Sequence, residues 1–213
     1  IFIIFIKKKL SNFFIKKKIK NQKRKHQIFL QTKNITHDFF SSHSYNFNQV
    51  LKKFNYFSYL EIGSFEGNSA LYVAHNFQNS EIHCVDNWVG TEEYGDLKFS
   101  NIELNFDKNV SAFTNIYKYK KTSDDFFYEN QKNFDVIYID GYHKGAQVFK
   151  DFKNSWKILK KGGIMIFDDY IWKFFEKIED NPCFAINEYL KLIKRDVRIL
   201  NVSNSQLFIQ KIN

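Results

Sequence analysis

Three aspartates and one histidine follow directly after two apolar stretches of the sequence: Asp140, His143, Asp168 and Asp169. The first two come after residues 134–139, and the other two come after residues 164–167. If both stretches are parallel strands of an open α/β sheet, their carboxyl ends meet at the edge where such sheets bind ligands. Carboxylate oxygens suit a hard divalent cation such as magnesium, which keeps waters and substrate oxygens in its remaining positions. A metal site formed by the three aspartates is therefore our first hypothesis.

A purely structural role is the alternative for these aspartates. Asp140 would then serve the turn at Gly141, and Asp168 or Asp169 would cap the turn that follows. The set of three favours the metal site more than any single member does.

A second group of residues has the pattern of a nucleotide-binding turn. The short run 59–62 is apolar apart from Glu61, Gly63 and Gly67 enclose a loop, and a helix is predicted from Asn68 onward. Such a turn lets backbone N–H groups and a helix N-terminus face a ligand, and glycines leave room for it. The spacing differs from the Gly-x-Gly-x-x-Gly of dinucleotide enzymes, which argues against a nicotinamide dehydrogenase.

Asp86 ends the next β-rich run, residues 81–86, about twenty residues after the glycine turn. In doubly wound folds an acid at this point commonly bonds the two hydroxyls of a ribose. Helix capping or a loop contact is the alternative. The interval from the glycine turn favours the ribose role.

The elements that must position these residues alternate between strand and helix along the chain. Besides the strands already named, residues 116–120 are predicted as a strand, and a turn at Gly162–Gly163 precedes the strand 164–167. A terminal hairpin is predicted from the runs 197–202 and 207–212. Helices are predicted, weakly for the first, over residues 99–113, 122–131, 145–159 and 182–195. With no internal repeat, the pattern predicts one α/β domain.

Four blocks together resemble the class I S-adenosylmethionine-dependent methyltransferases: residues 61–69, 85–88, 139–143 and 162–170. They are most similar to the bacterial family of macrocin-type sugar O-methyltransferases and cephalosporin-hydroxylase-like proteins. The resemblance covers roughly residues 55 to 213. It implies a doubly wound, mostly parallel, seven-stranded Rossmann-like sheet with an antiparallel C-terminal strand.

The resemblance also implies a role for each matching residue in binding the cofactor S-adenosylmethionine. Glu61, Gly63 and Gly67 would shape the site of its methionine end, and Ser69 would contact its carboxylate. The ribose hydroxyls would bind Asp86, and the adenine would contact Ser123 and Asp124. Trp88 would either stack on the adenine or pack in the interior.

The implied reaction is methyl transfer to a hydroxyl of a sugar or another small molecule. Asp140, Asp168 and Asp169 would hold the cation, and His143 would be the base. The unperturbed pKa of histidine, about 6.5, suits that role, although the sequence identifies no charged partner for His143. Two alternatives stay open: a metal-dependent hydroxylase of the same family, and a non-enzymatic scaffold that uses a basic N-terminal arm.

The net charge of +9 comes from residues 1–33, which hold eleven lysines and arginines and no acid. The predicted methyltransferase domain, residues 34–213, holds 21 basic and 23 acidic side chains, so no nucleic-acid partner is expected. The arm is predicted either as a solvated, disordered extension or as a basic helix that makes weak contact with anionic membrane surfaces. A first residue other than methionine also fits a chain that lacks its true start.

Two cysteines, Cys84 and Cys183, lie too far apart for a metal-binding or redox motif. This predicts a reduced, cytoplasmic setting, with Cys84 buried in its strand. His37 and His43 have no evident partners, and they are predicted as ordinary loop residues in a segment where related enzymes build part of a lid. The sequence leaves the oligomeric state and the acceptor open.

Overall fold

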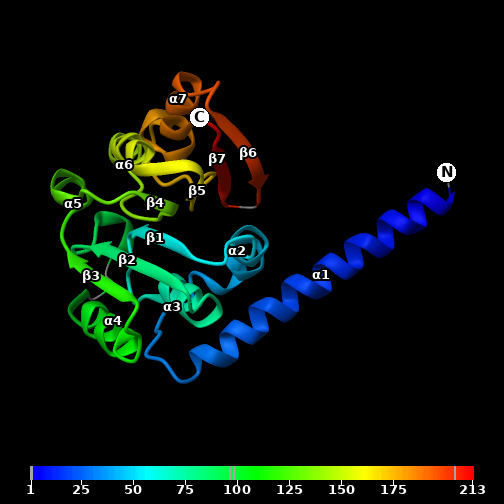
Figure 1. The fold of residues 1–213 in the computed structure, drawn as a ribbon, viewed down its shortest axis with the longest axis horizontal. Helices are drawn as coiled ribbons and strands as arrows, with labels where there is room; N and C mark the ends of the chain where they lie inside the picture. The colour runs from blue at the N-terminus through cyan, green and yellow to red at the C-terminus, as the bar shows by residue number, and fades with distance from the viewer. Residues whose placement is uncertain (1, 96, 98, 204) are drawn as a thin grey trace.

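The computed structural model describes residues 2–95, 97, 99–203 and 205–213, and its centre is a seven-stranded sheet (Figure 1). The strands lie in the order β3-β2-β1-β4-β5-β7-β6. Their bounds are β1 Phe57–Ile62, β2 Ser80–Asp86, β3 Ile116–Lys120, β4 Phe134–Ile139, β5 Leu159–Phe167, β6 Val197–Val202 and β7 Leu207–Lys211.

Five of these strands run parallel, and the C-terminal hairpin adds an antiparallel strand. β1 pairs in parallel with both β2 and β4, and β7 pairs antiparallel with β5 and β6. This confirms the predicted doubly wound, mostly parallel sheet with an antiparallel C-terminal strand. The strand order reverses between β1 and β4, so a crevice opens beyond their carboxyl ends.

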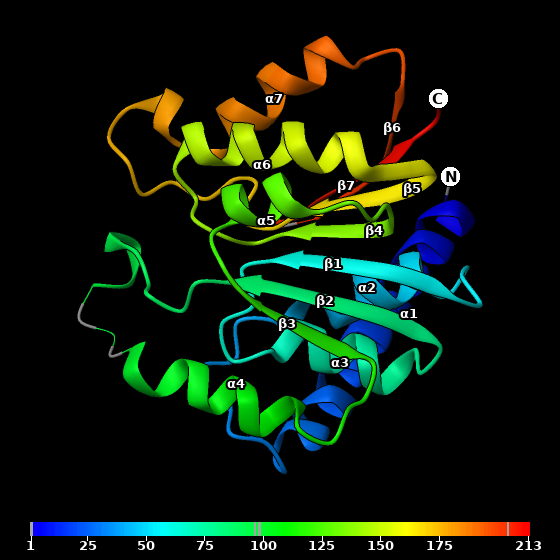
Figure 2. The same cartoon turned by 60° about the vertical axis from the view of Figure 1, so that its left-hand side comes forward.

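Helices cover both faces of the sheet, and each face has its own apolar core (Figure 2). On one face lie α2 (Ser44–Leu51), α3 (Asn68–Asn76) and α4 (Ile102–Val110). The opposite face is covered by α5 (Ser123–Glu129), α6 (Gly145–Ile158) and α7 (Pro182–Leu192). Because both faces are buried, nine of the twelve residues of β1 and β4 are apolar.

The apolar face of α6 packs in the core of the domain. Val148 and Phe152 are buried, and Phe152 packs against Phe167 of β5 with ring centroids 4.5 Å apart. Thr122 caps α5 by accepting a hydrogen bond from the Asp125 N–H at 3.1 Å, and Pro182 opens α7. A side-chain cap thus marks the start of α5, and a proline in the first turn marks the start of α7.

One predicted turn takes a different form in the structure. Gly162–Gly163 does not precede β5 but lies inside it, where the pairing with β4 shifts between Phe134–Leu159 and Val136–Ile164. Gly162 has a positive φ of 79°, which a glycine adopts without steric strain. The two glycines therefore mark an irregularity within β5 and not a turn before it.

Most of the basic arm forms one helix, α1 (Phe2–Leu30), which projects from the domain (Figure 1). Phe13 and Phe14 are exposed, whereas His26 and Leu30 near its end are buried against the domain. His26 Nε2 lies 2.7 Å from Asn68 Oδ1 at the start of α3. The end of the helix thus supports the glycine turn, while the boundary at residue 33 and membrane contact stay predictions.

Within the described part of the chain, no helix combines the length and the apolar content that crossing a membrane requires. Cys84 is buried in β2 as predicted, and both cysteines are free.

Candidate active site

A cavity of about 620 Å³ opens at the carboxyl ends of β1, β2, β4 and β5. Every residue predicted for the site except Glu61 and Gly67 lines it directly. The lining thus unites the predicted cofactor residues with the aspartates and the histidine, which come from segments more than one hundred residues apart.

The glycine turn is shaped by how closely β1 and β4 approach each other. Gly63 has a φ of 87°, and a Cβ there would lie 2.0 Å from the carbonyl oxygen of Asp140. Gly67 has a φ of 82° and stands directly before α3. Both positions need glycine, the first for space and the second for its backbone conformation.

Among the residues that the structure describes, three other than glycine have a positive φ, and all three follow a strand at this end of the sheet. They are Phe65, Trp88 and Asp169, with φ values of 48°, 54° and 48°. Aromatic side chains rarely adopt this conformation, so the surrounding structure must hold Phe65 and Trp88 in place. Strained backbone thus gathers around the cavity.

Asp86 supports the glycine turn directly. Its Oδ2 accepts the N–H groups of Ser64 and Phe65, each at 2.9 Å, and its Oδ1 accepts the N–H of Trp88 at 2.7 Å. Asp86 lines the cavity as the ribose role requires, and that role stays a prediction. Trp88 packs on Phe106 with ring centroids 4.9 Å apart, so packing describes it better than adenine stacking.

Glu61 is fully buried beneath the glycine turn. Tyr59 donates a hydrogen bond to its Oε2 at 3.0 Å, whereas Oε1 has no partner among the described residues. Burial raises the pKa of Glu61 to about 7, although the nearby hydroxyl groups of Ser69 and Tyr59 act in the opposite direction. The carboxyl group is therefore poised to change its charge near neutral pH.

The opposite end of the cavity is a polar cluster on α5 and α6. Gln147 Nε2 donates to Ser123 Oγ and to Asp151 Oδ1, each at 3.1 Å, and it lies 3.4 Å from Asp124 Oδ1. Burial raises the pKa of Asp151 to about 7. Gln147 and Asp151 belong to this end of the site but were not identified in the sequence, because they lie in an amphipathic helix pattern that indicated only core and surface.

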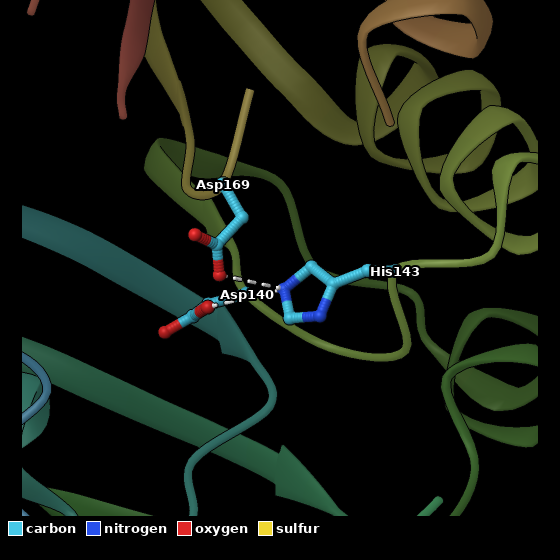
Figure 3. A group of neighbouring side chains, drawn as sticks. All are labelled: Asp140, His143 and Asp169. Atoms are coloured by element: carbon cyan, nitrogen blue, oxygen red, sulfur yellow. Dashed lines mark ion pairs between the residues drawn. The ribbon is translucent and has the colours of Figure 1, made fainter. Parts of the chain in front are cut away.

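Asp140, His143 and Asp169 converge on one point of the cavity wall (Figure 3). His143 Nε2 lies 3.6 Å from Asp140 Oδ1 and 3.3 Å from Asp169 Oδ2. A possible ligand atom from each residue lies within 4.8 Å of the others. Nε2 is buried, has no hydrogen-bond partner among the described residues, and points toward both carboxylates.

The electrostatics of this group fit a divalent cation. Burial and the neighbouring Asp168 raise the pKa of Asp140 to about 8, and the same two causes raise that of Asp169. Burial alone would lower the pKa of His143, but Asp140, Glu93 and Asp169 outweigh it and raise the pKa to about 10. A bound cation would offset the negative charge of these clustered carboxylates. Magnesium suits the site because it prefers oxygen ligands.

Asp168, the third predicted ligand, lies behind this group. Its Oδ2 accepts a hydrogen bond from Gln206 at 3.1 Å and another from the hydroxyl of Tyr138, which also lies 2.9 Å from Asp140 Oδ2. Its Oδ1 is 3.9 Å from His43 Nε2. His43 therefore has a partner and lines the cavity, unlike the ordinary loop residue expected from the sequence.

Two glutamates of the site were missed in the sequence. Glu66 is fully buried and accepts the N–H and the hydroxyl of Thr36, each at 2.7 Å, which holds the segment before β1 over the cavity. Glu93, whose side chain is only 4% exposed, lies 3.4 Å from His143 Nδ1. Both glutamates lie in segments that connect a strand to a helix, and neither residue type nor spacing there predicts such burial.

The comparisons with known proteins agree with this arrangement. A family model described as a methyltransferase domain matches residues 60–170, just over half of the chain. Uncharacterized protein R132 of Acanthamoeba polyphaga mimivirus is 27% identical over 113 residues, which are 53% of this chain and 51% of that protein. The chain thus spans about half the length of the curated relative that it matches.

Two solved structures share the fold at low sequence identity. The MycE methyltransferase of the mycinamycin biosynthetic pathway, in complex with Mg, SAH and mycinamycin VI, has a TM-score of 0.61 and 15% identity, over 83% of this chain and 51% of MycE. A Staphylococcus aureus protein named as a candidate caffeoyl-CoA O-methyltransferase also has a TM-score of 0.61, with 16% identity over 97% of this chain and 99% of its own. The chain belongs to the methyltransferase-domain family and has the fold of the class I S-adenosylmethionine-dependent methyltransferases.

Proposed function

We propose that this protein is an O-methyltransferase that uses S-adenosylmethionine and a divalent cation, and that it methylates a hydroxyl of a sugar or another small molecule. The observation that carries the proposal is a single cavity that holds both the glycine turn with Asp86 and the group of Asp140, His143 and Asp169. The MycE structure, a complex with Mg and SAH, supports the pairing of a cation with this cofactor on the same fold.

The cofactor would lie between the glycine turn and the polar cluster of α5 and α6. Asp86 would accept hydrogen bonds from the ribose hydroxyls while it holds the turn through backbone N–H groups. Ser123 and Asp124 would contact the adenine, and Ser69 the methionine carboxylate near the start of α3. When bound, the cofactor would supply an electrophilic methyl group on a sulfonium, which is a good leaving group.

Asp140 and Asp169 would hold the cation, supported by Asp168 through Tyr138. Bound there, a divalent cation would lower the pKa of an acceptor hydroxyl and offset the carboxylate charge that keeps His143 protonated. His143 Nε2 would then accept the hydroxyl proton, while the oxygen forms its bond to the methyl carbon and the carbon–sulfur bond breaks. The residues of this wall thus act by positioning the hydroxyl and removing its proton.

Calorimetric titration tests the cofactor part of this proposal. S-adenosylhomocysteine is titrated into the full chain, into Asp86→Asn and into Asp124→Asn, with and without magnesium. We expect binding to the full chain and weaker binding to both variants. Asn at position 86 can still accept backbone N–H groups through its amide oxygen, so the turn keeps support in that variant.

The outcome that would refute the proposal is the absence of binding to a well-folded wild-type chain in both conditions. Tritium transfer from labelled S-adenosylmethionine to a panel of sugars and glycosides then tests the acceptor class. We expect His143→Asn to abolish transfer while cofactor binding is retained, because His143 lies on the cation side of the cavity.

A further inference from the structure

A buried carboxylate from a loop stands directly beside the proposed base. Glu93 lies in the short η2 helix (Glu92–Tyr94) of the segment that connects β2 to α4. Its side chain is 4% exposed, whereas glutamates in loops are ordinarily solvated. Burying a charge is costly unless it is paired and hydrogen-bonded, so the position of this side chain needs a physical explanation.

Both oxygens of Glu93 are directed at one residue. Oε1 accepts the backbone N–H of His143 at 3.1 Å, and Oε2 lies 3.4 Å from Nδ1 of the same imidazole. The hydroxyl of Thr91 donates to Oε2 at 3.0 Å and restricts the rotation of the carboxylate. Glu93 thus holds the backbone and the ring of His143 together.

This contact determines which ring nitrogen keeps its proton when the imidazole is neutral. A carboxylate accepts hydrogen bonds and donates none, so Nδ1 must carry the proton next to Glu93. The proton-free nitrogen is then Nε2, which faces Asp140 and Asp169 and has no hydrogen-bond partner in the part of the chain that the structure describes. Which nitrogen is protonated follows from the hydrogen bond that the other nitrogen makes.

The loop that carries Glu93 is itself fixed to both halves of the site. Tyr94 stacks on Phe65 of the glycine turn, with ring centroids 5.8 Å apart and an interplanar angle of 12°. On the other side, Glu92 accepts a hydrogen bond from the hydroxyl of Tyr142, the neighbour of His143. The segment therefore connects the cofactor side of the cavity with the cation side.

We propose that Glu93 is the positioning residue of a carboxylate–histidine pair, which directs the proton-accepting Nε2 of His143 at the acceptor hydroxyl. This inference rests on the proposed function in one respect, the assignment of His143 as base. By holding Nδ1–H, Glu93 also stabilises the imidazolium that forms when Nε2 takes the proton.

Ring-nitrogen NMR tests the pair without any acceptor substrate. Protein labelled with ¹⁵N in its histidine rings is measured with MgCl₂ and S-adenosylhomocysteine, and His143 is identified by its absence in His143→Asn. We expect a hydrogen-bonded, slowly exchanging proton on Nδ1 and no proton on Nε2. In Glu93→Ala we expect the Nδ1 proton signal to be lost or the proton to move to Nε2.

The matched control is Glu176→Ala, which removes an exposed glutamate in the loop after β5 and leaves the contacts of Glu92 and Glu93 in place. The control should keep the wild-type spectrum of His143, and circular dichroism verifies that all variants fold. Two results would overturn the proposal: an Nδ1 proton that persists unchanged in Glu93→Ala, or an Nε2 that keeps its proton in the magnesium-loaded wild-type protein.

Kinetics give a second measurement once an acceptor is found. Glu93→Gln should lower kcat by about 10²-fold, within the range that an oriented general base contributes, and leave the KM for S-adenosylmethionine unchanged. Glu93→Asp should recover part of the loss. An equal change in KM would instead indicate a purely structural role. A protein that shows the NMR signature but binds no cofactor would refute the proposed function and leave the Glu93–His143 pair intact.

Discussion

The buried carboxyl group of Glu61 should make the stability of this protein fall as the pH rises through neutrality. Its pKa is raised from 4.5 to about 7 in the folded chain, chiefly by burial. Between these two values the folded state binds more protons than the unfolded state, so the free energy of unfolding decreases with increasing pH. The stabilisation that the raised pKa of Glu61 contributes to the folded state is complete below pH 4.5 and is lost as the pH rises through 7.

The magnitude follows from the size of the shift. A difference of 2.5 pH units corresponds to about 3 kcal/mol, of which roughly 2.5 kcal/mol lies between pH 5 and pH 8. Glu61→Gln removes the titration and keeps the shape of the side chain. From pH 5 to pH 8, the free energy of unfolding of the variant should therefore rise by about 2.5 kcal/mol relative to that of wild type. Every other titrating group is common to both proteins and cancels in this difference.

Urea unfolding followed by tryptophan fluorescence at pH 5, 6, 7 and 8 measures this difference. Glu176→Gln, at an exposed position in the loop after β5, is the matched control and should follow the wild-type curve. Parallel pH dependences for wild type and Glu61→Gln would refute the reasoning. In that case the folded chain would solvate or pair the carboxylate of Glu61 in a way that the buried geometry does not show.

Three further changes test the backbone of the site. Asp86→Ala should lower the free energy of unfolding by about 1–3 kcal/mol relative to Asp86→Asn in chemical denaturation, because alanine offers no acceptor to the backbone N–H groups that Asp86 binds, whereas asparagine keeps its amide oxygen. Asp169→Gly should be about 1 kcal/mol more stable than Asp169→Ala, because glycine accepts the φ of 48°; both variants should bind magnesium more weakly in calorimetry. Gly63→Ala should fail to give a cooperative thermal transition, since a Cβ would lie 2.0 Å from the carbonyl oxygen of Asp140. Gly95→Ala meets no atom within 4 Å and has only the strain of its φ of 52°, about 1–2 kcal/mol, so it should still unfold cooperatively at a lower temperature than wild type. A normal transition for Gly63→Ala, or equal stability within either pair, would contradict these assignments.

The sequence by itself determined the fold and most residues of the candidate site. Apolar runs that end in carboxylates, and glycines that follow the first of them, are local patterns with a period and a spacing. They placed Asp86, Asp140 and Asp169 at strand ends, and parallel strands bring their carboxyl ends to one edge of a sheet. The terminal hairpin followed equally from alternation and turn residues.

Tertiary structure alone decided which further polar side chains, not named from the sequence, enter the site. Glu93 and Glu66 are glutamates in irregular segments, and their burial depends on the packing of distant residues such as His143 and Thr36. The same holds for His43, whose distance to Asp168 depends on how the segment before β1 crosses the sheet. A sequence pattern reports the periodicity of one element, whereas the charge around a base depends on several elements whose contacts form only when the chain packs.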